Sequence, residues 1–524
     1  MMAVAAAPAV LHVCSEVFPL LKTGGLADVT AALPPALQEL GCDARLLLPG
    51  FPGVWNGLKQ LQPVAEFAPR FGKDGSRLWR GLMDNGIVCY LIDSPQHYQR
   101  AGNPYADERG QPYADNHVRF ALLAVMALHL ANGADPAWRP AVLHCHDWHA
   151  GLAPAYLRAH ETGASILAGN AGGTGIGAGG VNKKLAGSVM TIHNLAYQGL
   201  FPRPLFAELG LPAQFNDMHG VEFYQQISYL KAGLVYADKI TTVSPTYARE
   251  ILGSEQGCGL DGLLRHRQND LSGILNGVDP QIWHPRQDSL IAASYDAADL
   301  AGKARCKAAL QQMCGLARGE TVSAAESAGK SAPASGPLFG VVSRLTEQKG
   351  LHLLLAGLPE IIRQGGQVVV LGSGEPELEQ AFAAAAATQP QSVAVRLGFD
   401  EAFAHQIMAG CDVIGVPSRF EPCGLTQLYG LQYGSLPLVH RVGGLADTVQ
   451  DVALENLDDG SATGFVFSQF SQTAFDAAVR RAFALFKRPG EWRAVQAQAM
   501  RQDVGWQASA KAYLALYRQV APPA

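Results

Sequence analysis

The sequence has few charged residues and no feature that would hold it on nucleic acid or in a membrane. Charged residues make up 16% of its 524 residues, and 40 Lys and Arg stand against 45 Asp and Glu, for a formal net charge of −5. This balance provides no basic face, which argues against non-specific electrostatic binding to nucleic acid. No apolar run of about 18 residues occurs, so we expect no membrane-spanning helix.

Cysteine is present, but not in the patterns that make disulfide frameworks or zinc sites. There are nine cysteines, an odd number, and no two of them form a C-x-x-C pair. Cys14, Cys89, Cys145 and Cys411 lie in strand-like runs, which predicts reduced thiols in the core. The apolar start of the chain lacks the basic segment of a secretory leader. We therefore expect a cytoplasmic protein.

Apolar runs alternate with segments of helical spacing along the whole chain. A chain of 524 residues is too long for one core, so at least two domains are expected. The alternation predicts parallel, doubly wound α/β sheets, in two domains joined near residues 285–300 and facing each other across a cleft. The first series of runs comprises residues 10–14, 45–48, 88–92, 141–144, 189–193 and 239–243; the second comprises 338–342, 367–371, 393–396, 413–416 and 437–439.

Two stretches interrupt this alternation. Residues 163–187 are rich in glycine, with seven glycines between Gly169 and Gly180. The stretch lacks the Gly-Lys-Ser/Thr ending of a phosphate loop, so its composition favours a surface loop. Residues 318–336, rich in Ser, Ala and Gly, also predict a loop.

A predicted strand, loop and helix at residues 413–433 give the clearest candidate for a binding site. Pro417 ends the strand, Glu421 lies on the loop, and the helix is predicted from Gly424 to Tyr433. Backbone N–H groups at a helix start attract anions, and parallel sheets bind ligands at the carboxyl ends of their strands. A carboxylate beside that site could bind a sugar hydroxyl. The alternative is an ordinary connection with a solvated glutamate.

Other polar residues also follow predicted strands. Arg344 and Lys349 share one loop, as a pyrophosphate site requires, although two surface ion pairs would give the same pattern. Lys22 precedes two glycines that allow close backbone approach to a ligand, a weak signal by itself.

The segment His144-Cys-His-Asp-Trp-His149 suggests a zinc site, because it combines imidazoles with a carboxylate. Successive residues of a strand point to opposite faces, and we expect this alternation to prevent the ligands from converging. The sequence therefore predicts no metal site.

Taken together, these motifs resemble those of the bacterial glycogen synthases, which are relatives of the plant starch synthases. The resemblance extends from about Val10 to Tyr517, with the motifs in the family's order. The matching segments are Lys22-Thr-Gly-Gly-Leu, His146-Asp-Trp-His, His193-Asn-Leu-Ala-Tyr-Gln-Gly, Asn276-Gly-Val-Asp, Ser343-Arg-Leu-Thr-Glu-Gln-Lys-Gly and Arg419-Phe-Glu-Pro-Cys-Gly-Leu-Thr-Gln.

The resemblance implies a GT-B fold, in which two Rossmann-like domains face each other across a cleft. Residues 1–290, completed by a C-terminal helix at 502–524, would form the acceptor-side domain, and residues 291–501 the nucleotide-sugar domain. The implied reaction moves glucose from ADP-glucose to the non-reducing end of an α-1,4-glucan such as glycogen, with retention of configuration. It implies no cofactor and no metal, and no Asp-x-Asp loop accompanies the proposed pyrophosphate site.

The resemblance also implies roles for individual residues. Arg344 and Lys349 match the cations that hold the donor's pyrophosphate, and Glu421 matches the acidic residue that contacts the donor glucose. His193 and Asp147 match further sugar-binding residues, and we place all five in the catalytic group.

Further positions match the family's substrate-binding residues. They are Lys22, Gly24, Gly25, Asn276, Lys307, Phe399, Cys423, Gly424, Leu425 and Thr426. Lys22 matches the lysine assigned to ADP-glucose, Phe399 falls where an aromatic ring stacks on adenine, and Cys423 is expected to be a contact and not a nucleophile.

One departure and two alternatives remain at this level. Tyr429 stands where many retaining GT-B enzymes carry a second glutamate, a feature that the bacterial glycogen synthases share. A transferase that uses UDP-glucose, or one similar to sucrose synthase, would have the same architecture. A non-catalytic glucan-binding protein is the second alternative, and the intact Lys22, Arg344, Lys349 and Glu421 count against it.

Overall fold

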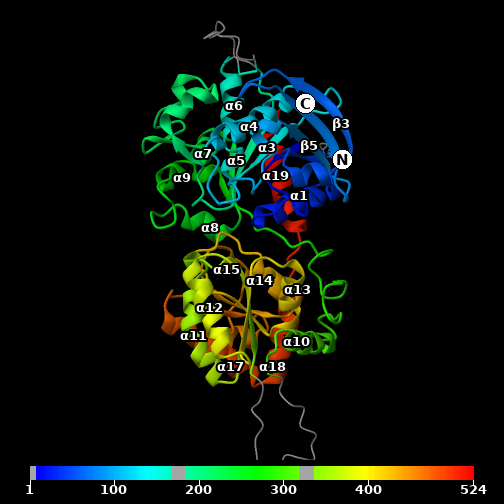
Figure 1. The fold of residues 1–524 in the computed structure, drawn as a ribbon, viewed down its shortest axis with the longest axis vertical. Helices are drawn as coiled ribbons and strands as arrows, with labels where there is room; N and C mark the ends of the chain where they lie inside the picture. Colours follow the sequence, from blue (N-terminus) through cyan, green and yellow to red (C-terminus); the bar gives the residue numbers. More distant parts are fainter. Residues whose placement is uncertain (1–6, 165, 168–182, 318–335, 524) are drawn as a thin grey trace, which may run out of the picture. The chain divides into compact units, whose positions relative to one another are not determined.

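The computed structural model describes residues 7–164, 166–167, 183–317 and 336–523, and these residues fold into two compact units (Figure 1). Unit 1 comprises Met1–Asn276 and Trp506–Ala524, and unit 2 comprises Gly277–Gly505. Most of the glycine-rich loop and of the loop at 318–336 predicted above lies outside the described residues. Among the described residues, no helix is both long enough and apolar enough to cross a bilayer.

The central sheet of unit 1 is parallel over most of its width, as the alternating sequence pattern predicts. Its strand order is β12-β11-β7-β6-β1-β2-β5-β4-β3, and the antiparallel pairs involve β3 and β4. The strands are β1 (Val10–Val13), β2 (Ala44–Pro49), β3 (Lys59–Phe67), β4 (Ser76–Leu82), β5 (Val88–Asp93), β6 (Val142–His146), β7 (Gly187–Ile192), β11 (Lys239–Thr242) and β12 (Leu271–Gly273). A small antiparallel sheet is formed by β8 (Leu200–Pro202), β10 (Gln226–Ser228) and β9 (Glu222–Phe223).

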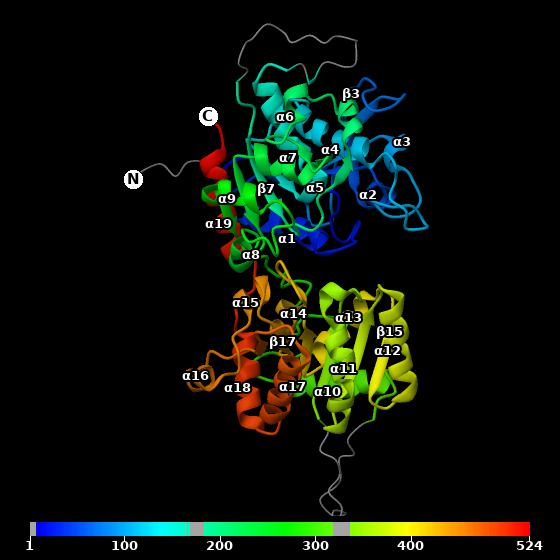
Figure 2. The same cartoon turned by 90° about the vertical axis from the view of Figure 1, so that its left-hand side faces the viewer.

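The last helix of the chain completes unit 1. Figure 2 shows α19 (Gln507–Val520) beside α1 (Gly25–Glu39) and β7, and the buried face of α19 packs into an apolar cluster with α1. Tyr513, Leu514 and Tyr517 belong to this cluster, together with Leu33 and Leu37 of α1. Ser509 Oγ also donates a hydrogen bond to Leu275 O, 2.5 Å away. Burial of this apolar face holds the C-terminal segment on unit 1.

The remaining helices of unit 1 surround its sheet. They are α2 (Pro52–Gly57), α3 (Pro95–Tyr98), α4 (Asn116–Ala131), α5 (Asp147–Ala150), α6 (Leu152–Glu161), α7 (Tyr229–Tyr236), α8 (Pro245–Glu250) and α9 (Asp261–His266). Helix α4 is buried over almost its whole length, because its apolar residues extend around the helix and not along one stripe.

Unit 2 is a parallel doubly wound sheet with the order β15-β14-β13-β16-β17-β18. Its strands are β13 (Leu338–Val342), β14 (Gln367–Gly372), β15 (Val393–Leu397), β16 (Val413–Val416), β17 (Leu436–His440) and β18 (Phe465–Phe467). The order reverses between β13 and β16, and the carboxyl ends of strands beside such a switch point are the usual ligand sites of this fold.

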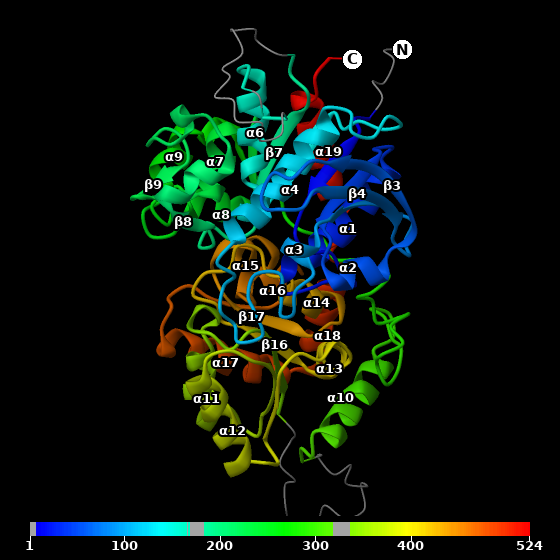
Figure 3. The same ribbon diagram turned by 45° about the horizontal axis from the view of Figure 1, so that its top comes forward.

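Helices lie on both faces of the unit 2 sheet. In Figure 3, α11 and α12 lie on one side of the sheet, and α10 and α13 lie on the other. The helices are α10 (Ala301–Met313), α11 (Leu351–Arg363), α12 (Pro376–Thr388), α13 (Glu401–Gly410), α14 (Thr426–Gln432), α15 (Gly443–Thr448), α16 (Leu454–Asp458), α17 (Gln472–Phe486) and α18 (Pro489–Met500).

The division between the units falls earlier than the predicted boundary at 290/291. Residues 277–290 belong to unit 2, because this connection packs into the core of unit 2. The Trp283 ring stacks between His405 and Tyr429, with ring centroids 3.8 and 3.9 Å apart. Tyr429, the residue that replaces a second glutamate, is therefore a packing residue inside unit 2.

We predict that Leu514→Ala destabilises unit 1 by about 2–5 kcal/mol, because it leaves a cavity beneath α19. Hydrogen exchange of the amides in β1 and β6 measures this change. Lys511→Ala is the matched control: it removes an exposed side chain from the same helix and should change stability by less than about 0.5 kcal/mol. Equal protection in the wild type and in Leu514→Ala would contradict the role given to α19.

Candidate active site

An ion pair between Lys349 and Glu421 lies at the carboxyl edge of the unit 2 sheet. Lys349 follows β13, Glu421 follows β16, and Lys349 Nζ is 2.6 Å from Glu421 Oε2. The same carboxylate oxygen accepts a hydrogen bond from Ser418 Oγ at 2.9 Å. The Lys349 side chain is 19% exposed and that of Glu421 is 8% exposed, so the pair is largely shielded from water.

Two glycines with left-handed backbones allow three loops to meet at this pair. Gly350 has φ +66°, and a Cβ there would lie 1.9 Å from Pro417 O, at the start of the Glu421 loop. Gly443 has φ +43°, and a Cβ there would lie 1.9 Å from Glu421 O. Any side chain at either position would force the loops apart, so these two contacts determine where Lys349 and Glu421 lie.

The residues after Glu421 lie next to the pair in sequence and complete the connection to α14. Gly424 has φ +71°, Cys423 is buried, and Thr426 Oγ1 is 3.4 Å from Val342 O at the end of β13. Helix α14 begins at Thr426 and ends at Gln432, so the predicted helix from Gly424 to Tyr433 is too long. Leu425, between Gly424 and Thr426, is half-buried.

Arg344 and Phe399 follow β13 and β15, and so they lie at the same edge of the sheet. Arg344 Nη2 is 3.5 Å from Gln348 Oε1, and the loop that carries both residues packs against the Glu421 loop through a hydrogen bond from Arg419 N to Gln348 O at 2.8 Å. Phe399 is 75% exposed, so much of this aromatic side chain is accessible to solvent.

Lys307 lies away from this group of residues. Its Nζ is 2.6 Å from Asp412 Oδ2, and the same oxygen accepts a hydrogen bond from Leu338 N at 2.7 Å. Asp412 and Leu338 are at the amino ends of β16 and β13, the opposite edge of the sheet from Lys349 and Glu421. Lys307 thus has a structural partner at that edge, and we leave it out of the site.

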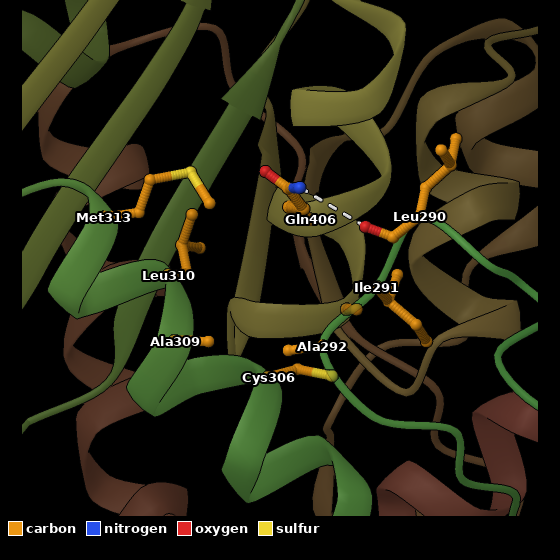
Figure 4. Close-up of a pocket in the computed structure, with 9 residues that line it drawn as sticks. Leu290, Ile291, Ala292, Cys306, Ala309, Leu310, Met313 and Gln406 are labelled. Carbon is orange, nitrogen blue, oxygen red and sulfur yellow. Dashed lines mark hydrogen bonds between the residues drawn. The ribbon is translucent and has the colours of Figure 1, made fainter.

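Figure 4 shows a separate cavity of unit 2, of about 140 Å³, beside α10. It is lined by Leu290, Ile291, Ala292, Cys306, Ala309, Leu310, Met313, Gln406 and Ala409. The lining is mainly apolar and includes none of the predicted site residues. It offers little for a sugar or a phosphate to bind.

In unit 1, the Lys22 loop is held by a glutamate that the sequence analysis missed. Glu16 is buried, and its carboxylate accepts hydrogen bonds from Thr23 N, Thr23 Oγ1 and Gly24 N at 2.5, 2.6 and 3.3 Å. Lys22 Nζ is 2.9 Å from Asp28 Oδ1. Glu16 comes soon after β1, and an acidic residue at the end of an apolar strand was the signal for it in the sequence.

Asp147 fixes the backbone that carries His193. Asp147 Oδ1 accepts hydrogen bonds from His193 N at 2.8 Å and from Asn194 N at 3.4 Å. Asp147 has φ +54°, a strained conformation for a residue other than glycine, and such strain is common at functional sites. Asn276, also predicted for the site, is buried, and its Oδ1 has no hydrogen-bond partner among the described residues.

The histidines beside Asp147 converge, so the argument from strand alternation was wrong for them. His144 and His146 are two residues apart and point to one face of β6, where His12 of β1 joins them. Their ligand atoms lie within 4.8 Å of one another. However, His144 Nδ1 and Nε2 are hydrogen-bonded to Tyr517 and Thr191, and His12 Nδ1 is hydrogen-bonded to His146. The cluster is therefore already connected by hydrogen bonds.

Comparison with known proteins identifies the family. Residues 9–169 and 178–266 match the starch synthase catalytic domain, and residues 324–494 match glycosyl transferases group 1. The chain is 55% identical over 513 residues to the glycogen synthase of Francisella tularensis subsp. novicida, a match that covers 98% of this chain and 99% of the relative. The chain belongs to the glycogen synthase family.

Other relatives agree with this assignment. The glycogen synthase of Francisella philomiragia subsp. philomiragia is 54% identical and also covers 98% of the chain, and 99% of that relative is matched. The solved catalytic domain of starch synthase IV from Arabidopsis thaliana, bound to ADP and acarbose, is 30% identical, with a TM-score of 0.84 over 98% of this chain and 99% of that one. A sucrose-phosphate synthase from Thermosynechococcus elongatus shares the fold, with 15% identity and a TM-score of 0.54 over 98% of both chains.

Membership of the glycogen synthase family confirms the predicted fold and activity. The protein is a GT-B glycosyltransferase with two Rossmann-like units, and it transfers glucose to an α-1,4-glucan. The alternative of a non-catalytic glucan-binding protein is thereby excluded.

We predict that Asp147 makes the stability of unit 1 depend on pH. Burial raises the pKa of Asp147 to about 7, from about 3.9 in an unfolded chain. The unfolded state therefore releases this proton first, and the stability contributed by the protonated group is lost as pH rises from about 4 through about 7. In Asp147→Asn, whose amide oxygen can still accept from His193 N, this part of the pH dependence should vanish.

Urea denaturation of both proteins across this pH range measures the effect. The free energy of unfolding of the wild type, minus that of Asp147→Asn, should fall as pH rises. Parallel curves for the two proteins would show that Asp147 has an ordinary pKa.

Proposed function

We propose that the protein takes glucose from ADP-glucose and attaches it, with retention of configuration, to the non-reducing end of an α-1,4-glucan. The observation that carries the proposal is the Lys349–Glu421 pair, with Arg344 on the Lys349 loop, at the switch point of the unit 2 sheet. The bound ADP and acarbose of the Arabidopsis relative are consistent with a nucleotide donor and a glucan-like acceptor.

In this proposal, Lys349 and Arg344 bind the pyrophosphate of the donor. The Lys349 ammonium has three N–H donors, and Glu421 takes one of them among the described residues. The others can reach phosphate oxygens, and the Arg344 guanidinium adds a second cation from the same loop. As ADP leaves, negative charge grows on the phosphate, and fixed cations stabilise that charge most strongly in the transition state.

Glu421 binds the glucose of the donor, and Phe399 stacks on its adenine. The position of the Glu421 carboxylate is fixed by Lys349 and Ser418, so it can accept a sugar hydroxyl without reorganising. The backbone from Cys423 to Thr426 follows Glu421 directly in the chain, and we assign its N–H groups to binding of the donor.

Unit 1 contributes Lys22, with Gly24 and Gly25 beside it, and His193, whose backbone is held by Asp147. Asn276, whose buried Oδ1 lacks a partner among the described residues, is a further candidate to bind the sugar. We assign these residues to the glucose and to the leaving phosphate during the reaction.

The proposed chemistry is a front-face substitution. The bond between C1 of glucose and the β-phosphate oxygen breaks, and ADP leaves. The O4 atom of the acceptor forms a bond with C1 on the same face, and its proton passes to the departing diphosphate. Glu421 stabilises the positive charge that develops on the sugar, by electrostatic attraction and not by forming a covalent bond.

Transfer of labelled glucose to glycogen tests the donor and the role of Glu421 together. We predict that label from ADP-glucose is incorporated, and that Glu421→Ala lowers kcat by at least about 100-fold, because a preorganised contact with the reacting sugar is lost. Glu347→Ala is the matched control, since Glu347 lies on the Lys349 loop, is 71% exposed at its side chain and pairs with Arg419. Near-normal turnover in Glu421→Ala would contradict the assignment of Glu421 to the site. Faster transfer from UDP-glucose than from ADP-glucose would show that UDP-glucose is the donor.

We further predict that the two lysines act at different stages. Lys349 belongs to unit 2 and should bind ADP directly, so Lys349→Ala should weaken ADP binding and also lower kcat. Lys22 belongs to unit 1, and Lys22→Ala should leave ADP affinity within about twofold while it lowers kcat. Each loss should be roughly 10- to 150-fold, the value of a charge-assisted contact.

Calorimetric titration with ADP and initial rates on both variants measure these effects. An equal loss of ADP affinity in Lys22→Ala and Lys349→Ala would contradict the division of roles between the two lysines.

A further inference from the structure

Three imidazoles from adjacent strands of unit 1 form a line of hydrogen bonds that ends at His193. His12 lies in β1, His146 ends β6, and His193 follows β7, and these strands are neighbours in the sheet. His12 Nδ1 is 3.1 Å from His146 Nε2, and His146 Nδ1 is 3.0 Å from His193 Nε2. Both distances are those of good hydrogen bonds, so at each step one ring donates and the next accepts.

The three rings are neutral, which limits the line to two arrangements. Burial lowers the pKa of His12 and of His193 to about 3, and it holds the pKa of His146 well below its ordinary value. A neutral imidazole has one N–H donor and one acceptor nitrogen. The protons therefore all point along the line toward His193, or all point back toward His12.

The far end of the line decides between these two directions. His12 Nε2 is buried and has no hydrogen-bond partner among the described residues. If the line ran toward His12, this nitrogen would carry a proton and would be a buried N–H without an acceptor. If it runs toward His193, His12 Nε2 is an unused lone pair. Buried N–H groups without a partner are rarer than buried acceptors without one. The arrangement in which the protons point toward His193 is therefore favoured.

We infer that His12 and His146 are positioning residues, which fix His193 in the neutral tautomer with its proton on Nδ1. The line uses Nε2 of His193, so Nδ1 is left as a hydrogen-bond donor for the substrate. The described residues offer Nδ1 no hydrogen-bond partner, and Nδ1 is not among the fully buried unpaired atoms, in contrast to His12 Nε2. The inference rests on the proposed role of His193 as a residue that contacts the donor sugar.

This arrangement suits a reaction in which the sugar gains positive charge. A neutral N–H donor can hold a hydroxyl of the sugar, whereas an imidazolium would repel the developing charge. To become charged, His193 would need a proton on Nε2, and the whole line would then have to reverse. That reversal would leave the Nε2–H group of His12 buried without an acceptor. The cost of this unpaired group opposes protonation of His193.

His144 provides a matched control within the same cluster. Its ring is 4.1 Å from that of His146, centroid to centroid, and it is equally buried. Its nitrogens, however, bond to Tyr517 OH at 2.7 Å and to Thr191 Oγ1 at 2.6 Å, and not to the line. Loss of His144 therefore removes an imidazole from β6 without removing a donor to His193.

The tautomer can be read directly from the full-length protein by ¹⁵N NMR of labelled histidine, with the His193 signals assigned by their loss in His193→Ala. We expect His193 to carry its proton on Nδ1 in the wild type. In His146→Phe the Nε2-protonated form should appear, and kcat should fall roughly tenfold with KM within about twofold, as for loss of one oriented hydrogen bond. His144→Phe should leave the His193 signals unchanged.

A proton on Nε2 of His193 in the wild type would overturn the inference, as would unchanged His193 signals in His146→Phe. The wild-type spectrum alone decides the direction of the line if His146→Phe fails to fold. The proposed role of His193 has a separate test: normal turnover in His193→Ala would refute its contact with the donor, whatever its tautomer. Reduced turnover in His193→Ala, together with a proton on Nε2 in the wild type, would support the contact of His193 with the donor and refute the proposed direction of the hydrogen bonds.

Discussion

The proposed site depends most on the contact between the Lys349 ammonium and the Glu421 carboxylate. They are 2.6 Å apart on loops from two adjacent strands, in a largely shielded position. Two opposite charges so placed fix each other, and removal of either leaves the other partly buried without its partner, at a cost of several kcal/mol. The contact exists because Gly350 and Gly443 have no side chain to hold the loops apart. One pair can therefore hold both the phosphate and the sugar of the donor, with little movement on binding.

Unit 1 positions His193 in a different way, through hydrogen bonds to buried groups and not through an ion pair. Asp147 holds the backbone of His193 through two N–H groups, and His146 holds its ring. Helix α19 is connected to the same cluster, because Tyr517 bonds to His144. The C-terminal segment thus packs beneath the strands that present His193. In the proposed reaction, cationic residues face the phosphate, and neutral His193 and the Glu421 carboxylate face the sugar. This distribution of charge suits the departure of an anion from a sugar that gains positive charge.

Much of this arrangement could be predicted from the sequence, because parallel strands bring their carboxyl ends to one edge. Arg344, Lys349 and Glu421 were each predicted after a strand, and Phe399 was predicted from the family resemblance. The structure places all four at one edge of the unit 2 sheet. Lys307 shows the limit of prediction from family motifs. It was predicted to bind substrate, but it lies on a helix and pairs with Asp412 at the amino ends of the strands, and a motif match does not indicate which edge of the sheet a helix residue faces.

Contacts between distant strands were harder to predict. His12 and His146 are brought together by the pairing of β1 with β6, and no local pattern indicates that pairing. Strand alternation was applied to neighbouring residues and overlooked that His144 and His146 share a face. Glu16 was missed because it bonds to the backbone N–H groups of Thr23 and Gly24 and to the Thr23 hydroxyl. Most loop sequences offer such groups, so they do not point to a particular partner.

A double-mutant cycle on kcat/KM for ADP-glucose tests most directly whether Lys349 and Glu421 act as one unit. Lys349→Ala, Glu421→Ala and the double variant would be compared with the wild type under the same conditions. If each residue positions the other, the double variant should lose little more than the more damaging single variant, within about threefold. If the two losses multiply, the residues contribute independently, and the pair is not the interaction on which the site depends.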